Sequence, residues 1–146
     1  MPSSENAPEP WDVIVREHLT GDVLVVKGKR IAHITEALWE YEFLTHLDLS
    51  DNLISVLPSG ASLLRNLTEL HLDNNKLEEL PPSLGTMHWL QVLSLAGNRL
   101  TGFLEDSPRE NLDMRCLTYL DLNSNKLATI PLTLKYLTSL SVLRIG

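Results

Sequence analysis

The sequence has little cysteine, little positive charge and no long hydrophobic run, and each shortage excludes a class of protein. Its 146 residues contain a single cysteine, Cys116, so neither an intramolecular disulfide nor a thiolate metal cage can form. Twelve Lys and Arg stand against nineteen Asp and Glu, a net charge of −7. This balance argues against a nucleic-acid partner, because affinity for phosphates depends on basic side chains.

Apolar segments long enough for a membrane are also missing. No run approaches the roughly 18 apolar residues that a membrane span needs. The first six residues are polar and acidic, unlike a secretory signal peptide. We therefore expect a cytoplasmic, single-domain protein with no membrane span and no nucleic-acid partner.

Leucine, in contrast, is in excess: 31 of the 146 residues, roughly twice the usual share or more. Most leucines follow one pattern, Leu-x-x-Leu-x-Leu-x-x-Asn, which recurs at intervals of 23, 23 and 27 residues. A further copy opens at Leu140, and a fainter copy starts near Gly21. The first leucines of the four full copies are Leu44, Leu67, Leu90 and Leu117, and their asparagines are Asn52, Asn75, Asn98 and Asn125. A repeated structural unit therefore explains the composition.

This pattern resembles the leucine-rich repeat family over residues 21–146. The 23-residue spacing, with a Leu-Pro or Ile-Pro step after the asparagine, is similar to the intracellular Ras-scaffold and Scribble-like subgroup. The resemblance implies an α/β solenoid, a right-handed superhelix with a parallel concave β-sheet and an irregular or short-helical convex side. It also implies a non-catalytic protein-binding role, with signalling proteins such as small GTPases or phosphatases as the partner class.

The residues support the same architecture on physical grounds. The last two leucines of each motif alternate at period two, which places them on the inner face of a short strand. The asparagine follows where the chain turns, and its amide can satisfy backbone groups of its own and the adjoining coil, so we predict a stacked asparagine ladder. Proline after the turn cannot donate a backbone hydrogen bond, which favours an irregular or short-helical return.

Both ends of the solenoid need a cover, because a coil cannot bury its leucines alone. Residues 1–9 read as a disordered tail. Residues 10–20 predict an N-terminal capping helix, since Trp11, Ile14, Val15 and Leu19 share one helical face. Residues 21–146 hold five coils and the first strand of a sixth, with no C-terminal cap, so we expect further chain or another subunit to cover that edge. The coils are 21–43, 44–66, 67–89, 90–116 and 117–139.

The fourth coil carries four extra residues between Phe103 and Cys116. We expect Leu112 and Met114 to recover core positions, so that the insertion bulges near residues 105–110, and we expect Cys116 to be buried. Ser107 precedes a proline and is a candidate phosphorylation site. The alternative is a tolerated solvated loop, because dipeptide motifs recur by chance.

The repeat register also maps the exposed face of the sheet, because equivalent residues stack about 4.8 Å apart on adjacent strands. The N-terminal half of this face gathers carboxylates and two histidines, with Asp48 beside His71 and His46 beside Glu69. The C-terminal half gathers an apolar strip with a charged rim, a composition typical of a binding centre. The predicted partner-binding residues are Glu69, His71, Val92, Tyr119, Asp121, Val142 and Arg144.

Two alternatives stay open at this stage. Asp121 and Arg144 could simply neutralise one another beside a strip too small to bind. The chain could also be a structural subunit of a large permanent multiprotein assembly rather than a scaffold or adaptor. The two roles differ in isolation: a scaffold domain is soluble and monomeric, whereas an assembly subunit aggregates or co-purifies with its neighbours.

Catalytic and cofactor chemistry find little support in the residues. His46, Asp48, His71 and Asp73 have suitable ligand types but lie on an open sheet, which excludes little water and offers no pocket. The glycines are scattered singly, so no phosphate-cradling loop is present. We therefore expect no enzyme activity, no metal site and no cofactor.

Overall fold

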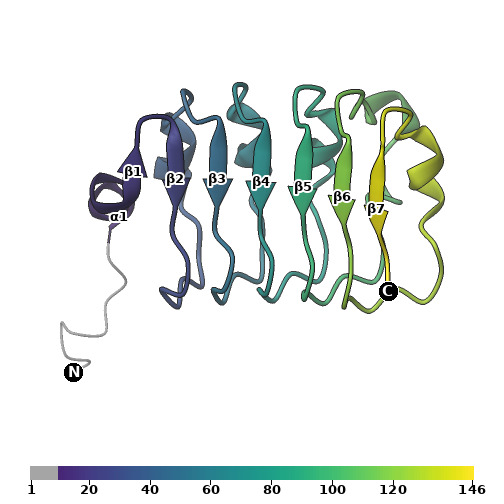
Figure 1. Cartoon of the computed structure of the whole chain (residues 1–146), viewed down its shortest axis with the longest axis horizontal. Helices are drawn as coiled ribbons and strands as arrows, with labels where there is room; N and C mark the ends of the chain where they lie inside the picture. Colours follow the sequence, from purple (N-terminus) through teal and green to yellow (C-terminus); the bar gives the residue numbers. More distant parts are fainter. Residues whose placement is uncertain (1–9) are drawn as a thin grey trace.

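Seven short strands lie side by side in one sheet, in the order of the chain (Figure 1). The computed structural model describes residues 10–146. All neighbouring strands from β2 onwards are parallel, and their central leucines are aligned from Leu24 to Leu143. The predicted α/β solenoid with a parallel sheet is confirmed. The strands are β1 (Leu19–Thr20), β2 (Val23–Val25), β3 (His46–Asp48), β4 (Glu69–His71), β5 (Val92–Ser94), β6 (Tyr119–Asp121) and β7 (Val142–Arg144).

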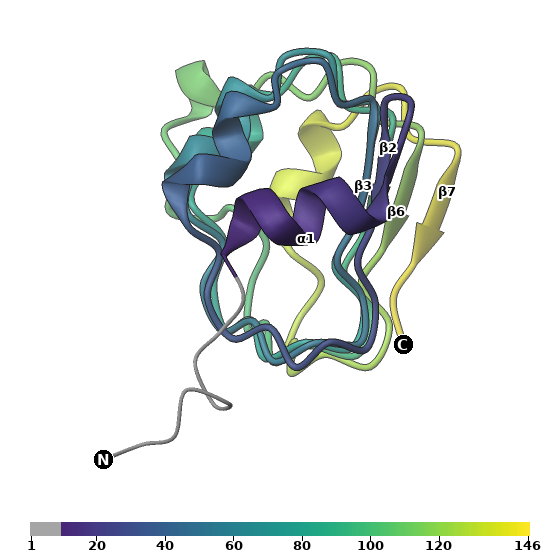
Figure 2. The same ribbon diagram turned by 90° about the vertical axis from the view of Figure 1, so that its left-hand side faces the viewer.

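Short 3-10 helices form the opposite side of the solenoid (Figure 2). They are η2 (Glu36–Glu40), η3 (Ser59–Leu63), η4 (Pro82–Thr86), η5 (Arg109–Asn111) and η6 (Leu132–Tyr136). Pro58, Pro81 and Pro131 stand directly before three of these helices, with φ between −58° and −67°. Proline fixes this φ and needs no hydrogen-bond acceptor for its nitrogen, so it suits the first position before a helical turn.

The framework leucines fill the space between the sheet and the helices. The strand leucines Leu47, Leu70, Leu93 and Leu120 are all buried, and so are the leucines that follow them two residues later. Each buried leucine contributes about 1.5–3 kcal/mol relative to an exposed one. A coil keeps this burial only while its neighbours cover it, so the stack is stabilised along its length.

The asparagine ladder forms as predicted. The amide oxygen of Asn52 accepts hydrogen bonds from the backbone N–H of Lys29 and Ile31 in the preceding coil, and its nitrogen donates to the carbonyl of Val26. The next asparagine, Asn75, accepts from Ile54 in the same way. Each amide therefore joins two coils at a turn that no sheet hydrogen bond reaches.

One residue before each asparagine position, the backbone takes the left-handed conformation. Its φ lies between 54° and 68° at Gly28, Asp51, Asn74, Gly97 and Ser124. Gly, Asn and Asp adopt this region most readily, and four of the five positions carry one of them. This turn signal was visible in the sequence and was missed.

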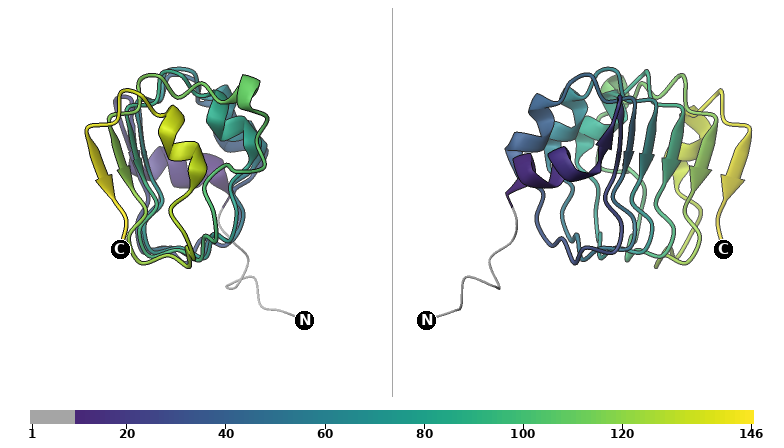
Figure 3. Two further views of the ribbon diagram at one scale, coloured as in Figure 1. Left: turned by 90° about the vertical axis from the view of Figure 1, so that its right-hand side faces the viewer. Right: turned by 60° about the vertical axis from the view of Figure 1, so that its left-hand side comes forward.

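The N-terminal end differs from the prediction of a helix over residues 10–20. Helix α1 (Trp11–His18) ends earlier, and β1 pairs with β2 in antiparallel fashion. The reason is the two-residue turn at Gly21 and Asp22, where φ of Gly21 is 62°, a backbone suited to a tight hairpin. Helix α1 lies across the open end of the first coil (Figure 3). The predicted tail, residues 1–9, lies outside the described residues.

The insertion in the fourth coil bulges where it was expected. Met114 is buried, Leu112 packs against the core from a half-buried position, and residues Glu105 and Asp106 are exposed. Leu104 takes the place that proline occupies in the second, third and fifth coils and is buried with a φ of 54°. The prediction for Cys116 is wrong, because its side chain is exposed. Residue Cys116 points outward just before its strand, where the equivalent Phe43 and Asn66 of earlier coils are also exposed.

Candidate protein-binding surface on the sheet

The predicted apolar strip is a continuous unit on the exposed face of the sheet. Val92 of β5 and Val142 of β7 lie directly on either side of Tyr119 of β6 in the strand register. Val142 is 42% exposed, while Val92 and Tyr119 are half-buried. A second row, Ser94, Asp121 and Arg144, runs parallel to the strip two residues further along the same strands.

Tyr119 is held between two charged neighbours. Its hydroxyl donates to Oδ2 of Asp121 at 3.4 Å, and the guanidinium carbon of Arg144 lies 5.9 Å from its ring centroid. Burial raises the pKa of Tyr119, and the negative charge of Asp121 adds to this rise. The side chain is therefore a neutral, oriented aromatic group at pH 7, with an apolar body and a polar tip.

Asp121 has a structural role that the sequence did not show. It is only 8% exposed, and its Oδ1 accepts the backbone N–H of Asn123 at 2.9 Å. Asp48 does the same for Ser50 at 3.0 Å, so aspartate at this repeat position caps the end of its strand. Within residues 10–146, Asp121 and Arg144 form no ion pair within 4.0 Å, so they do not neutralise one another by direct contact.

The acidic half of the face is centred on Glu69. Its two carboxylate oxygens lie 3.4 Å from Nε2 of His46 and 3.2 Å from Nε2 of His71. The expected pairing of Asp48 with His71 does not form, although the two residues are aligned on adjacent strands. Asp48 instead faces Lys27 at 3.9 Å, because its other oxygen is engaged by the strand cap. Glu69 thus links the two histidines across two strands.

Asp73 belongs to the framework rather than to a free acidic patch. Its Oδ1 accepts the hydroxyl of Ser94 at 2.6 Å and the backbone N–H of Ala96 at 2.8 Å. In the part of the chain that the structure describes, no group of three or more His, Cys, Asp or Glu residues is arranged to hold a metal ion. Asp73 is therefore engaged by the neighbouring strand, and the carboxylate that links side chains on this half is Glu69.

Ser107, the candidate phosphorylation site, lies in the inserted loop far from the strip along the chain. It is half-buried, and its backbone N–H donates to the carbonyl of Leu104 at 3.1 Å. Its modification stays a prediction.

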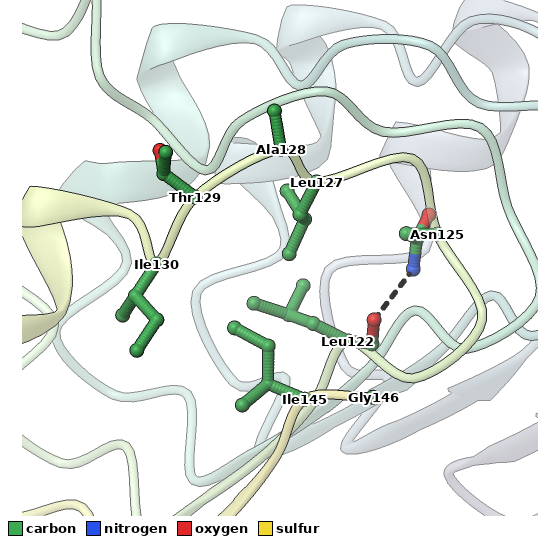
Figure 4. A pocket seen from close by; sticks show the side chains of 8 residues that line it. All are labelled: Leu122, Asn125, Leu127, Ala128, Thr129, Ile130, Ile145 and Gly146. Atoms are coloured by element: carbon green, nitrogen blue, oxygen red, sulfur yellow. Dashed lines mark hydrogen bonds between the residues drawn. The ribbon is translucent and has the colours of Figure 1, made fainter.

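A hollow of about 300 Å³ lies at the last coil (Figure 4). Its walls are the apolar side chains of Leu122, Leu127, Ile130 and Ile145, and the Asn125 amide donates to the carbonyl of Leu122 at 3.0 Å along one side. These are the repeat positions that a following coil covers elsewhere in the stack. The hollow is therefore framework surface, and it lacks the converging polar groups of a ligand pocket.

Comparison with known proteins decides the family. A family model described as leucine rich repeat matches residues 42–100 and 65–127, which together span more than half of the chain. The chain belongs to the leucine-rich repeat family. Repeats of this family mediate protein–protein interaction and are not enzymes, so the chain is a non-enzymatic interaction module.

Relatives of this repeat chain are found in distant organisms. It is 36% identical, over 94% of its length, to the human leucine-rich repeats and immunoglobulin-like domains protein 3, of which it spans only 12%. Among solved structures, a leucine-rich repeat protein of Leptospira interrogans superposes with a TM-score of 0.76 at 31% identity, over 83% of this chain and 30% of that one.

Two further structures share the repeat architecture. The functional domain of InlJ from Listeria monocytogenes gives a TM-score of 0.66 at 28% identity, over 85% of this chain and 25% of that one. A chain of the BIR3–SERK2 complex from Arabidopsis thaliana gives 0.64 at 30% identity, over 84% and 66%. Within residues 10–146 of the leucine-rich repeat chain, no helix is long and apolar enough to cross a membrane.

Proposed function

We propose that the chain is a scaffold or adaptor module that binds a partner protein on the exposed face of β4 to β7. The observation that carries this proposal is the in-register strip of Val92, Tyr119 and Val142 beside Arg144. Binding energy at protein interfaces concentrates in a few large aromatic and arginine side chains surrounded by a polar rim. The strip has this composition, with Glu69 and His71 at its border.

The geometry favours Tyr119 as the anchor. Its ring is oriented by Asp121 and Arg144, so little side-chain freedom is lost when a partner covers it. Asp121 orients this anchor, because its carboxylate accepts hydrogen bonds from the Tyr119 hydroxyl and the Asn123 N–H and so is not a free carboxylate. From the resemblance to the intracellular subgroup, we propose a cytoplasmic location and a signalling protein such as a small GTPase or a phosphatase as the partner class.

The test is affinity purification from the source cell followed by quantitative mass spectrometry. The bait is compared with its double variant Tyr119→Ala and Arg144→Glu, which removes the anchor and reverses the rim charge. Asp121 is left intact because its loss would uncap β6. The matched control is Tyr136→Ala with Arg109→Glu, since the Arg109 guanidinium lies 4.7 Å from the Tyr136 ring outside the sheet.

The proposal predicts that specific partners are lost from the first variant and kept by the control. Equal recovery with both variants places the partner elsewhere. Thermal melting of all three proteins checks that each variant is folded.

A structural subunit of a permanent assembly is the second candidate. The observation that favours it is the exposure of Leu132 outside the sheet, at 77%. Covering a leucine this exposed with a neighbouring subunit removes apolar surface from water, which favours association. Light scattering after size exclusion separates the two roles: a scaffold module runs as a monomer, whereas an assembly subunit aggregates or co-purifies with its neighbours at fixed stoichiometry.

A further inference from the structure

A groove of about 940 Å³ runs across the return segments of the solenoid, away from the exposed face of the sheet. A return segment is the part of each coil that follows the asparagine position and leads to the 3-10 helix. Return segments of successive coils line it, from Ser55 in the second coil to Lys126 in the fifth. The groove is thus as long as at least three coil spacings, about 14 Å at the 4.8 Å separation of the strands. Four or five residues of an extended chain cover this length at about 3.3 Å each.

The inserted loop of the fourth coil builds one wall of the groove. Where Pro58 and Pro81 start helical turns, Leu104 has a φ of 54° and turns the chain outward. The loop then folds back, and Oε2 of Glu105 comes to 2.6 Å from the position that a Cβ on Gly102 would take. The insertion therefore contributes one wall of the groove, and the regular coils before and after it contribute the rest.

The regular coils add apolar side chains and two prolines to the lining. Val56 is 65% exposed on the second coil, and Leu80 lies half-buried on the third. Pro81 and Pro82 beside Leu80 have no backbone N–H to offer. At Pro81 and Pro82 an occupant is therefore held by side-chain contacts rather than by backbone hydrogen bonds.

Charge complementarity indicates the kind of occupant. Four carboxylates line the groove, on Glu78, Glu79, Glu105 and Asp106, against two cations, on Arg99 and Lys126. None of these carboxylates forms an ion pair within residues 10–146. Carboxylates without an ion-pair partner attract basic side chains. The groove therefore favours an occupant that carries lysine or arginine.

We propose that this groove binds an extended protein segment in which lysine or arginine alternates with apolar residues. The apolar side chains cover Val56 and Leu80, and the basic ones face Glu79 and the carboxylates of the inserted loop. This surface shares no residue with the sheet strip, so a segment bound here leaves the strip open.

A fluorescein-labelled nine-residue peptide of alternating lysine and leucine is the probe, titrated by fluorescence anisotropy with the full chain. We expect the peptide to bind the full chain. Glu79→Lys and Glu105→Lys should each raise its dissociation constant about five- to tenfold. The matched control is Glu40→Lys, the same charge change on the exposed face of η2, which should leave affinity within about twofold.

Val56→Ser distinguishes binding in the groove from non-specific electrostatic attraction. It leaves the net charge unchanged and removes only an exposed apolar side chain that the fold does not need. Weaker binding by Val56→Ser supports the groove. Equal loss in Glu40→Lys and Glu79→Lys, or unchanged affinity in Val56→Ser, overturns it. The sheet variant Tyr119→Ala keeps peptide affinity if the two surfaces are independent, so failure here is distinguishable from failure of the sheet proposal.

Discussion

Asn75→Ala is the substitution that tests most sharply how the coils are joined. Asn75 is 7% exposed, and its Oδ1 accepts the backbone N–H of Ile54 at 3.0 Å. Its Nδ2 donates to the carbonyls of Leu49 and Leu72 at 3.0 and 3.1 Å. Alanine fits the space but removes every one of these hydrogen bonds.

The loss of stability in Asn75→Ala depends on which backbone groups keep another hydrogen-bond partner. The Leu49 and Leu72 carbonyls keep the amides of neighbouring asparagines, whereas the Ile54 N–H has no other acceptor in residues 10–146. An unsatisfied buried donor costs about 1–3 kcal/mol, and each weakened carbonyl adds a fraction of a net hydrogen bond. We expect the free energy of unfolding to fall by about 2–4 kcal/mol.

Urea unfolding followed by circular dichroism measures this change. The control is Asn66→Ala, because Asn66 donates a single exposed hydrogen bond to the Glu42 carbonyl at 2.8 Å. Water replaces that bond, so we expect a loss below about 1 kcal/mol. If the two variants lose stability to within about 0.5 kcal/mol of each other, the asparagine ladder does not hold the coils together.

Three further outcomes follow from single positions. Gly97→Ala should cost more stability than Gly28→Ala in the same urea experiment, because both have φ near 65° but only at Gly97 does a Cβ collide with the Asn74 side chain; equal costs contradict this packing. Because burial raises the pKa of Tyr119, an alkaline absorbance titration should show a component above the ordinary tyrosine pKa, and Tyr119→Phe should remove it. The neutral phenol stabilises the fold below the ordinary tyrosine pKa, and this contribution is lost as pH rises through the folded value. Cys116 should react fully with a thiol reagent in the native state, and protection until unfolding would show that it is buried.

The repeat register was predictable from the sequence because leucine spacing determines which residues face inward. A shift of one residue would turn Leu70 and Leu72 out of the core, so the alignment of Val92, Tyr119 and Val142 follows directly. The asparagine ladder was predictable for a similar reason: a turn beyond the sheet needs a donor and an acceptor of its own.

Other features depend on local hydrogen-bond choices that spacing does not reveal. Glu69 contacts both histidines because Asp48 is occupied by its own strand cap. Asp121 also accepts hydrogen bonds from the Tyr119 hydroxyl and the Asn123 N–H, and its role in partner binding stays a prediction. The groove could not be predicted, because the path of the insertion depends on the unusual backbone of Leu104.

Hydroxyl-radical footprinting of the chain with and without a captured partner tests the central claim most directly. The two comparable aromatic probes are Tyr119 on the sheet face and Tyr136 outside it, and both are half-buried in the free chain. Binding on the sheet predicts that oxidation of Tyr119 falls severalfold in the complex while Tyr136 is unchanged. Protection of Tyr136 with no change at Tyr119 would contradict binding on the exposed face of the sheet.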